Sequence, residues 1–544
     1  MPVRKTCLLT FLLAILFGTA CSFGPSPTPT SVPMPSPTPA RPATPPATAT
    51  PSPTVVPAAV VTATPLPSPT PLPPIQIRQY RPGVLLHPLA AAAVGDAVYA
   101  IESGKLKVLD LRSSVDPRII APADNTVEGY PIQDLASLAY AVQKKALYLL
   151  DRSGAVYGWD LAGRWWLDRK PGGNSDYSQE YPVDLASDGQ AVYLLDTNNG
   201  RIWKRSGDEW VQLITSSQLE GGIRLAVAGD LFILVGERPS RPARLLRLRS
   251  GNLTEVKVGG GLDEPSLLAT AGNGSLLLVD QRFRRLRLVD GNTGETRRVA
   301  TGSAADILAL TGGEVTVLLG PDWLVSIDGL LPDQLAIHPV SPSAQVLSPN
   351  NPAVLSHPPK LHMPIAGAPL PRTPRSLPGS PRPYRVGIHE GIDRYASTVG
   401  ATVGRGTAVL AAGDGVVTRA DLDYVETTPA QMDQYLKECL DKRLTPPAIQ
   451  DKLGGRQVWI DHGNGVSTRY LHLSGIASGI KVGSTVKAGD VIAYAGNSGT
   501  PEAADGSSAD VHLHFEVRIG SGYLGQWIAP IETRRLLADV FDTP

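Results

Sequence analysis

The sequence predicts an all-β chain with two folded parts, and two observations lead to this fold class. Between about residues 76 and 340, short apolar runs recur every 40 to 50 residues, each followed by a polar or glycine-containing turn. After residue 384, further runs alternate polar and apolar residues, as strands with one buried face do. Because 544 residues exceed what one hydrophobic core can hold, we expect several domains joined by linkers.

The composition argues against binding by bulk charge. Lys plus Arg and Asp plus Glu number 50 each, so no excess of positive charge predicts a nucleic-acid partner. Of the 3 cysteines, Cys7 and Cys21 lie near the N-terminus, which leaves Cys439 without a second cysteine. No internal disulfide framework is therefore expected. Partners have to be inferred from individual sites.

Residues 1–21 are predicted to be an export signal. Basic residues precede an apolar run that is too short for a stable membrane span. Gly18-Thr19-Ala20-Cys21 resembles a bacterial lipoprotein cleavage site, although Gly18 stands where that site usually has leucine. We therefore expect lipidation of Cys21, which would anchor the protein to the outer face of the cytoplasmic membrane. The small residues before the cysteine also suit ordinary signal peptidase, which would make the protein a secreted one.

Residues 22–75 are almost entirely Pro, Thr, Ser, Ala and Val, which predicts a disordered tether. This composition cannot bury a core, and it favours extended, polyproline-like backbone. At ~3.1 Å per residue, about 50 residues reach on the order of 150 Å when stretched. Such a tether would hold the folded parts well away from a membrane.

Residues 76–340 contain a repeat that predicts a β-propeller-like domain. Asp134-Leu135-Ala136-Ser137 returns as Asp184-Leu185-Ala186-Ser187, and comparable apolar starts follow at Leu225, Leu267 and Ile307. Each unit of short antiparallel strands cannot cover its own apolar face, so we expect about six units to stack radially as blades. The repeat carries no metal-binding or catalytic constellation in its sequence.

Residues 341–383 return to a composition rich in Pro, Ser and Arg, which predicts a second linker. Whether this linker inhibits the part that follows is left open. Residues 384–544 form the second folded part, and five of the nine histidines lie there. We therefore expect the chemistry of the protein in this part.

Two motifs of the second part predict a metal site. His389 and Asp393 stand four residues apart around a glycine, so a bent loop can bring both side chains to one ion. The run 511–517 is strand-like, and strand alternation places His512 and His514 on one face while Leu513 and its apolar neighbours face the other way. Two imidazoles and a carboxylate suit zinc, with a fourth position left to water.

A third motif predicts a hairpin between these two. Residues 458–473 read as two strands joined by a turn at Asn464 and Gly465. On the second strand, Thr468, Tyr470 and His472 are expected to share one face. Together with strand-like runs at 408–418 and 482–499, this makes the core of the part predominantly β.

Taken in chain order, these motifs resemble a known family. They are His-x-x-x-Asp at 389–393, His-Gly-Asn-Gly at 462–465, Tyr-x-His-Leu at 470–473, Gly-Asn-Ser-Gly at 496–499 and His-Leu-His-Phe-Glu-Val at 512–517. The order resembles the lysostaphin/LytM family of zinc endopeptidases, which cut peptide bonds in bacterial peptidoglycan. The resemblance covers about 155 residues and implies an open β-sheet groove of the duplicated-hybrid-motif type.

The resemblance also implies roles for individual residues. The metal ligands would be His389, Asp393 and His514, and the catalytic pair would be His472 and His512. We expect His512 to act as the general base and His472 to stabilise the developing oxyanion. His462, beside the hairpin turn, is expected to be structural.

Two segments depart from the pattern of the family. A helical insertion at 424–453, with Thr-Pro pairs at 428–429 and 445–446 as helix starts, stands where the family usually has a short turn. It either walls one end of the cleft and sets specificity or decorates the surface. Residues 500–510 replace the usual Ser-Thr-Gly-Pro that leads into His-Leu-His, so the cleft wall is expected to differ there in shape.

The sequence thus leaves three hypotheses. The first is a zinc metalloendopeptidase of peptidoglycan cross-links or stems, tethered outside the cytoplasm, whose propeller binds cell-wall glycan or a protein or acts as a rigid spacer. The second is a catalytically idle cell-wall adaptor or hydrolase activator that works through its propeller. Members of the family that only activate typically lack ligands, and none is missing here. The third is a secreted enzyme that acts on rival bacteria.

Overall fold

A computed structural model describes residues 76–541, with gaps at 81–84, 86, 113–115, 172–179, 238–240, 272–273, 281–284, 303–306, 308, 313–314, 321–322, 329–334, 338–359, 372, 400–402 and 529. The predicted export signal with Cys21, the predicted tether and residues 341–359 of the predicted linker lie outside the described residues. Among the residues that are described, no helix combines the length and the apolar character needed to span a membrane.

The first folded part consists, within its described residues, of six four-stranded antiparallel sheets. Three sheets, each given from its inner to its outer strand, are β2 (Pro88–Val94), β3 (Ala97–Glu102), β4 (Lys105–Asp110) and β5 (Arg118–Ile120); β8 (Leu135–Ala141), β9 (Ala146–Asp151), β10 (Val156–Asp160) and β11 (Trp165–Arg169); and β12 (Pro182–Ser187), β13 (Val192–Asp196), β14 (Arg201–Ser206) and β15 (Glu209–Thr215).

The other three sheets are β16 (Gly222–Ala228), β17 (Asp230–Val235), β18 (Arg244–Arg249) and β19 (Asn252–Val256); β20 (Pro265–Thr270), β21 (Ser275–Asp280), β22 (Arg285–Asp290) and β23 (Thr296–Arg298); and β25 (Ala309–Thr311), β26 (Val315–Gly320), β27 (Trp323–Asp328) and β1 (Gln76–Tyr80). Two separate two-stranded sheets accompany them: β6 (Thr126–Val127) with β7 (Tyr130–Pro131), and β24 (Ala300–Gly302) with β28 (Leu335–Ile337).

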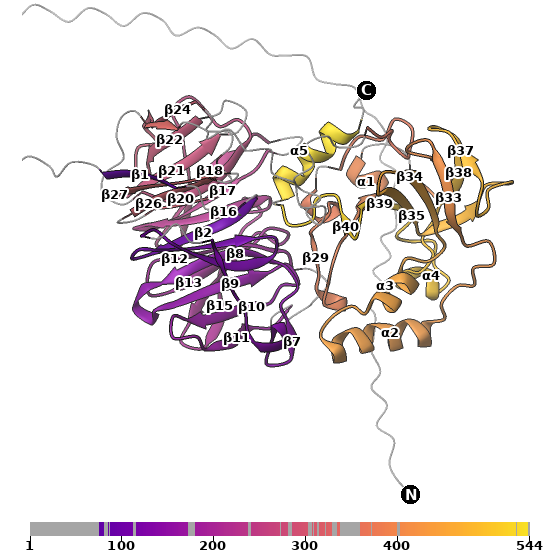
Figure 1. Ribbon diagram of the computed structural model, residues 1–544, viewed down its shortest axis with the longest axis horizontal. Coiled ribbons are helices and arrows are strands. Elements are labelled where there is room, and N and C mark those ends of the chain that lie inside the picture. Colours follow the sequence, from indigo (N-terminus) through magenta and orange to yellow (C-terminus); the bar gives the residue numbers. More distant parts are fainter. Residues whose placement is uncertain are drawn as a thin grey trace, which may run out of the picture. The chain divides into compact units, whose positions relative to one another are not determined.

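The six sheets close into a ring. The inner strands contact one another in the order β2, β8, β12, β16, β20 and β25, and β25 returns to β2. The first strand, β1, pairs with β27 of the last sheet, so the beginning of the domain completes its final blade. Figure 1 shows these sheets, coloured from indigo to pink along the chain. The architecture is a six-bladed β-propeller, as the repeat predicted.

Burial in the blades follows from this stacking. Every residue of β9 is buried, and so are five of the six residues of β21. A strand inside a stacked blade is covered on both faces, so its sequence is continuously apolar and does not alternate. Neighbouring blades are also tied by buried carboxylates. Asp184 accepts hydrogen bonds from the Ser137 hydroxyl (2.7 Å) and the Leu225 backbone N–H (2.7 Å), one from each adjacent blade.

The second folded part is built on two β-sheets. In spatial order the larger one contains β31 (Ile392–Arg394), β39 (Leu513–Ile519), β35 (Val466–Leu471), β34 (Val458–Gly463), β33 (Gly415–Ala420) and β37 (Thr485–Val486), with β40 (Gly522–Tyr523) beside β39. The smaller one contains β32 (Ala408–Leu410), β38 (Val491–Ala495) and β36 (Leu473–Ile476), and β29 (Pro381–Arg382) pairs with β30 (Gly387–Ile388). Apolar residues of the larger and the smaller sheet share one hydrophobic core, so the two sheets form a single unit. This unit positions the turns and loops that connect their strands.

Five α-helices accompany these sheets in the described residues: α1 (Ala396–Val399), α2 (Pro429–Lys442), α3 (Pro447–Leu453), α4 (Pro501–Ala504) and α5 (Pro530–Val540). Helices α2 and α3 form the predicted insertion between β33 and β34 (Figure 1). Thr428 caps α2 through a capping box with Gln431, as the sequence indicated. Thr445 does not cap α3, because Pro446 occupies the N-cap position; the hydroxyl of Thr445 donates to the backbone oxygen of Arg385 (2.6 Å).

The structure differs from the sequence prediction in the second half of the expected linker. Leu361, Ile365, Leu370 and Leu377 are buried in the core of the second part. Leu361 also forms a β-bridge to Phe541. Between its prolines this segment contains apolar residues that pack into the core, and its described residues form only short regular elements, such as a 3-10 turn at Pro374–Ser376 and the strand β29. This segment therefore belongs to the second folded part, and it leads directly into the site described next.

Candidate active site

The three predicted metal ligands converge although they come from distant segments. Asp393 on β31 and His514 on β39 lie directly opposite each other in the antiparallel register. His389 lies in the short turn between β30 and β31, four residues before Asp393. All three side chains are buried. Strand pairing therefore brings the two halves of the predicted ligand set together.

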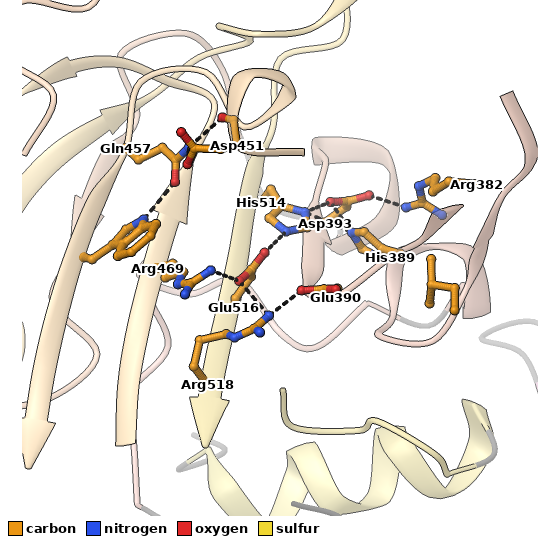
Figure 2. Close-up of polar contacts among 12 residues, drawn as sticks. Arg382, His389, Glu390, Asp393, Asp451, Gln457, Arg469, His514, Glu516 and Arg518 are labelled. Carbon is orange, nitrogen blue, oxygen red and sulfur yellow. Dashed lines mark hydrogen bonds and ion pairs between the residues drawn. The ribbon is translucent and has the colours of Figure 1, made fainter. Parts of the chain in front are cut away.

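Three atoms of these residues form what we call the acceptor triangle: Nε2 of His389, Oδ1 of Asp393 and Nδ1 of His514. Each of the three interatomic distances is 2.9 Å. Figure 2 shows the imidazole of His514 and the carboxylate of Asp393 facing each other, with His389 beside them. An ion at a usual zinc–nitrogen distance of about 2.0 Å could contact all three atoms at once.

The hydrogen bonds outside the triangle decide what it can hold. Nδ1 of His389 lies 3.0 Å from the backbone oxygen of Leu377, and Nε2 of His514 lies 3.2 Å from Oε1 of Glu516. Because both partners are acceptors, each of these nitrogens donates its proton outward. The neutral rings then direct lone pairs into the triangle, where Oδ1 of Asp393 is a third acceptor. Three acceptors that converge without a donor fit a cation.

The electrostatics of the triangle favour a neutral His389 and an ionised Asp393, whereas His514 holds a proton that a metal ion would have to displace. Burial, and next the neighbouring Arg382, lower the pKa of His389 to about 3, so that imidazole is neutral. Burial alone would raise the pKa of Asp393, but His389 and His514 outweigh it and hold that pKa well below its usual value. Burial would lower the pKa of His514, yet hydrogen bonds to Asp393 and Glu516 raise it to about 9. A proton and a metal ion thus compete for Nδ1 of His514.

Two further charged residues orient the ligands. Arg382 donates to Oδ2 of Asp393 (2.9 Å), which leaves Oδ1 for the triangle. Glu516 accepts from His514 and lies 3.5 Å from Arg469 and 3.3 Å from Arg518 (Figure 2). Its pKa is lowered to about 2, because these partners outweigh the effect of burial, so it remains an acceptor.

Sequence reasoning assigned neither Arg382 nor Glu516. A signal existed for Glu516, since it lies two residues after His514 and strand alternation places both on one face. Arg382 lay in a stretch that was predicted to be a linker. Nothing local to it indicated a contact with Asp393.

His472 and His512, the imidazole pair, lie beside the triangle with their ring centroids 4.6 Å apart. Nδ1 of His472 donates to the backbone oxygen of Ser498 (2.8 Å), and Nδ1 of His512 donates to that of Asp510 (2.7 Å). In the neutral rings both Nε2 atoms therefore carry a free lone pair. Nε2 of His512 lies 3.8 Å from Oδ1 of Asp393. The structure thus brings all five predicted site residues together.

The backbone at His472 differs from the prediction. His472 stands between β35 and β36 with a left-handed φ of 59° and does not continue the strand. Thr468 and Tyr470 do share a face, but they are buried and bond to each other (3.1 Å) in the core. The left-handed residue interrupts strand alternation, so the predicted common face was wrong for His472. His462 contacts the backbone oxygen of Asp414 and the hydroxyl of Thr468, each at 2.8 Å.

Aromatic stacking fixes the second imidazole of the pair. The ring of Tyr395 lies 4.3 Å from that of His512, with an angle of 21° between the planes. Tyr395 follows β31 by one residue, so the segment that carries Asp393 also supports His512. No local sequence pattern predicts this contact, because it depends on the pairing of β31 with β39.

The triangle and the imidazole pair line a cleft of about 530 Å³. The insertion contributes Leu436 from α2 and Gln450 and Leu453 from α3 to its walls, and α4 contributes Pro501 and Glu502. The two alternatives for the insertion were a wall of the cleft and a surface decoration. Its residues line the cleft, as the first alternative expected. The segment 500–510, expected to change the shape of the wall, begins with α4 and does line it.

Known proteins resemble this chain in both parts. Residues 445–526, which include the imidazole pair and His514, match the model of Peptidase family M23. A protein of Haemophilus influenzae described as an uncharacterized metalloprotease is 31% identical over 135 residues. That match covers 25% of this chain and only 19% of the relative.

Solved structures resemble the chain over a larger share. A virginiamycin B lyase from Staphylococcus aureus is 11% identical, with a TM-score of 0.36, and the match covers 47% of this chain and 100% of that one. A WD40 β-propeller domain is 12% identical, with a TM-score of 0.33, and covers 47% and 97%. The propeller itself follows from the closed ring of six sheets in this chain. The second folded part, which follows this propeller, thus contains a Peptidase M23 domain matched at residues 445–526, and His389 and Asp393 lie before the matched residues. The match and the metalloprotease relative support a metallopeptidase.

Proposed function

We propose that the protein is a zinc-dependent endopeptidase that hydrolyses peptide bonds in the cross-links or stems of bacterial peptidoglycan. The observation that carries this proposal is the acceptor triangle beside two imidazoles whose Nε2 atoms are free. Two nitrogens and one carboxylate oxygen are a ligand set that zinc prefers, with room for a water or substrate oxygen. The peptidoglycan substrate is proposed from the resemblance to the lysostaphin/LytM family.

Different side chains of the cleft have different roles in the proposed reaction. A zinc ion on the triangle would polarise the scissile carbonyl and lower the pKa of a bound water. Because Nδ1 of His512 donates to Asp510, its Nε2 would accept a proton from the attacking water and pass it to the leaving amine. Arg382 and Glu516 keep Asp393 and His514 in the orientation that the triangle requires.

The role of His472 as oxyanion stabiliser stays a prediction. Desolvation, together with the neighbouring His512 and His514, lowers the pKa of His472 well below its usual value, which favours the neutral ring. Because Nδ1 donates to Ser498, a neutral His472 can accept at Nε2 but cannot donate there. His472 would therefore have to take up a proton during turnover before it could stabilise an oxyanion.

We further propose that the enzyme acts outside the cytoplasmic membrane, anchored by a lipid on Cys21, and that its propeller positions it by binding the wall or a partner protein. Support comes from the sequence of the first 75 residues. Labelling cells with a radioactive fatty acid and comparing wild type with Cys21→Ala tests the anchor. Label in the wild type alone supports it, and an unlabelled, secreted wild type contradicts it.

Digestion of purified sacculi tests the enzyme. Released muropeptides are identified by mass spectrometry for the zinc-loaded protein, for the chelator-treated protein and for Asp393→Ala. We expect fragments with new peptide termini only from the zinc-loaded wild type. Asp441→Ala, which removes an exposed ion pair with Lys437 on α2, is the matched control and should cleave normally. Binding to sacculi without products would favour the adaptor hypothesis instead.

A further inference from the structure

The base of the insertion contacts the segment that orients His472. Residues 421–457 connect β33 and β34, which are neighbouring antiparallel strands that a short turn could join. The end of the insertion instead packs against Ser498 and Gly499. A Cβ on Gly499 would lie 2.4 Å from the nitrogen of Gly455, and one on Gly455 would lie 2.1 Å from the oxygen of Ser498. The two backbones are therefore in direct contact.

His472 is held by both of these backbones. Its N–H donates to the oxygen of Gly454 (2.9 Å), at the end of α3, and its Nδ1 donates to the oxygen of Ser498 (2.8 Å). The left-handed φ of 59° is sparsely populated for a residue with a side chain, so these contacts must maintain it. A displacement of Ser498 would release the imidazole.

Glu426, from the start of the insertion, holds the same segment from the other side. Its Oε1 accepts hydrogen bonds from the backbone N–H of Gly499 (2.9 Å), the hydroxyl of Tyr424 (2.7 Å) and the N–H of Thr427 (3.1 Å). One carboxylate oxygen thus connects the insertion to the residue that follows Ser498. A hydrogen bond to an ionised acceptor is stronger than one between neutral groups.

We propose that Glu426 is a positioning residue for His472, and that the two ends of the insertion, at Glu426 and Gly454, support this imidazole. Glu426 acts through Gly499 and Ser498. Its described hydrogen bonds go to Gly499, Tyr424 and Thr427, not to the acceptor triangle. The inference rests on the proposed function for its effect on turnover. Its effect on the imidazole of His472 does not depend on that function.

Substitution of Glu426 tests the proposal through kinetics. In the zinc-loaded full chain, Glu426→Ala should lower kcat by about 10-fold to 100-fold, because small misplacements of a reacting group have effects of this size. KM and metal content should stay near their wild-type values. Glu426→Gln should restore most of the activity, since its amide oxygen can still accept from Gly499. Glu438→Gln, which removes an exposed pair with Lys442 on α2, is the matched control and should change nothing.

A second readout does not require activity. With labelled histidine, nuclear magnetic resonance follows the Nδ1–H of His472, identified by its loss in His472→Ala. In Glu426→Ala this proton should exchange with solvent faster than in wild type, and in Glu426→Gln it should remain protected. An unchanged exchange rate in Glu426→Ala would overturn the proposal, and so would loss of metal or of the fold in that variant. If the wild type cleaves no sacculi, the proposed function fails while this measurement still decides the role of Glu426.

Discussion

The propeller and the peptidase domain each bury a carboxylate, and the two carboxylates differ in what surrounds them. Asp184 in the propeller accepts from the hydroxyl of Ser137 and from the N–H of Leu225. Oδ1 of Asp393 in the peptidase domain faces Nε2 of His389 and Nδ1 of His514, and the other nitrogen of each ring donates to Leu377 or Glu516. Burial is the same in both cases, so burial alone does not identify a functional carboxylate. The presence or absence of donors does.

Asp184 and Asp393 also differ in the direction of their pKa shifts. Burial raises the pKa of Asp184, only partly opposed by Arg224 and by its hydrogen bonds. The pKa of Asp393 is held well below its usual value, so this carboxylate stays ionised among acceptors. An ionised oxygen that faces two ring nitrogens fits a positive charge between them, either the proton of His514 or a metal ion that replaces it. The predictions below test this difference by removing one group at a time.

The largest effect is expected where the triangle loses its charge. Asp393→Asn should reduce bound metal from about one ion per chain to background and abolish turnover, because a neutral amide is a much weaker ligand. Elemental analysis after gel filtration measures the metal, and circular dichroism confirms the fold. A folded Asp393→Asn protein that retained stoichiometric metal would refute the interpretation of the triangle.

Removal of either imidazole should separate metal binding from catalysis. His472→Ala and His512→Ala are each expected to lower turnover by about 10²-fold to 10⁴-fold, the usual contribution of general acid–base catalysis. Metal content should remain that of the wild type, since neither residue belongs to the triangle. Parallel assays of metal and of muropeptide release check both statements, and a loss of metal in either variant would contradict them.

A smaller effect is expected from the support of the triangle. Glu516→Ala removes the acceptor that fixes the tautomer of His514, and such losses weaken metal binding by about 10-fold to 100-fold. Competition with a chelating dye measures the change in affinity. Glu516→Gln retains an oxygen for Nε2 of His514 and should lie between the alanine variant and the wild type. Equal affinities for all three proteins would show that Glu516 does not orient His514.

The smallest effect on activity is expected in the propeller. Asp184→Ala leaves the buried N–H of Leu225 without its acceptor, which should lower the free energy of unfolding by about 1 to 3 kcal/mol. Metal content and turnover of the folded protein should not change. Thermal unfolding measures the stability, with Asp208→Ala, at an exposed ion pair to Arg205, as the control. A loss of metal in Asp184→Ala would mean that the two carboxylates are not independent.

The sequence predicted those features that depend on short spacing or on repetition. The blades followed from apolar runs at regular intervals, and the triangle and the imidazole pair followed from five motifs in order. Arg382, Tyr395 and the oxygens of Leu377 and Ser498 could not be predicted. They reach the site only after β31 pairs with β39 and after 361–377 enters the core. The left-handed backbone of His472 was not predicted, because it breaks the strand alternation on which the prediction relied.

The pairing of β1 with β27 has a practical consequence for shortened versions of the protein. A chain that begins after Tyr80 would leave β27 with a row of unsatisfied amide and carbonyl groups along one side. An unpaired strand edge of this kind can pair with strands of other molecules, which leads to aggregation. Recombinant forms should therefore keep Gln76–Tyr80, even when everything before it is cut away.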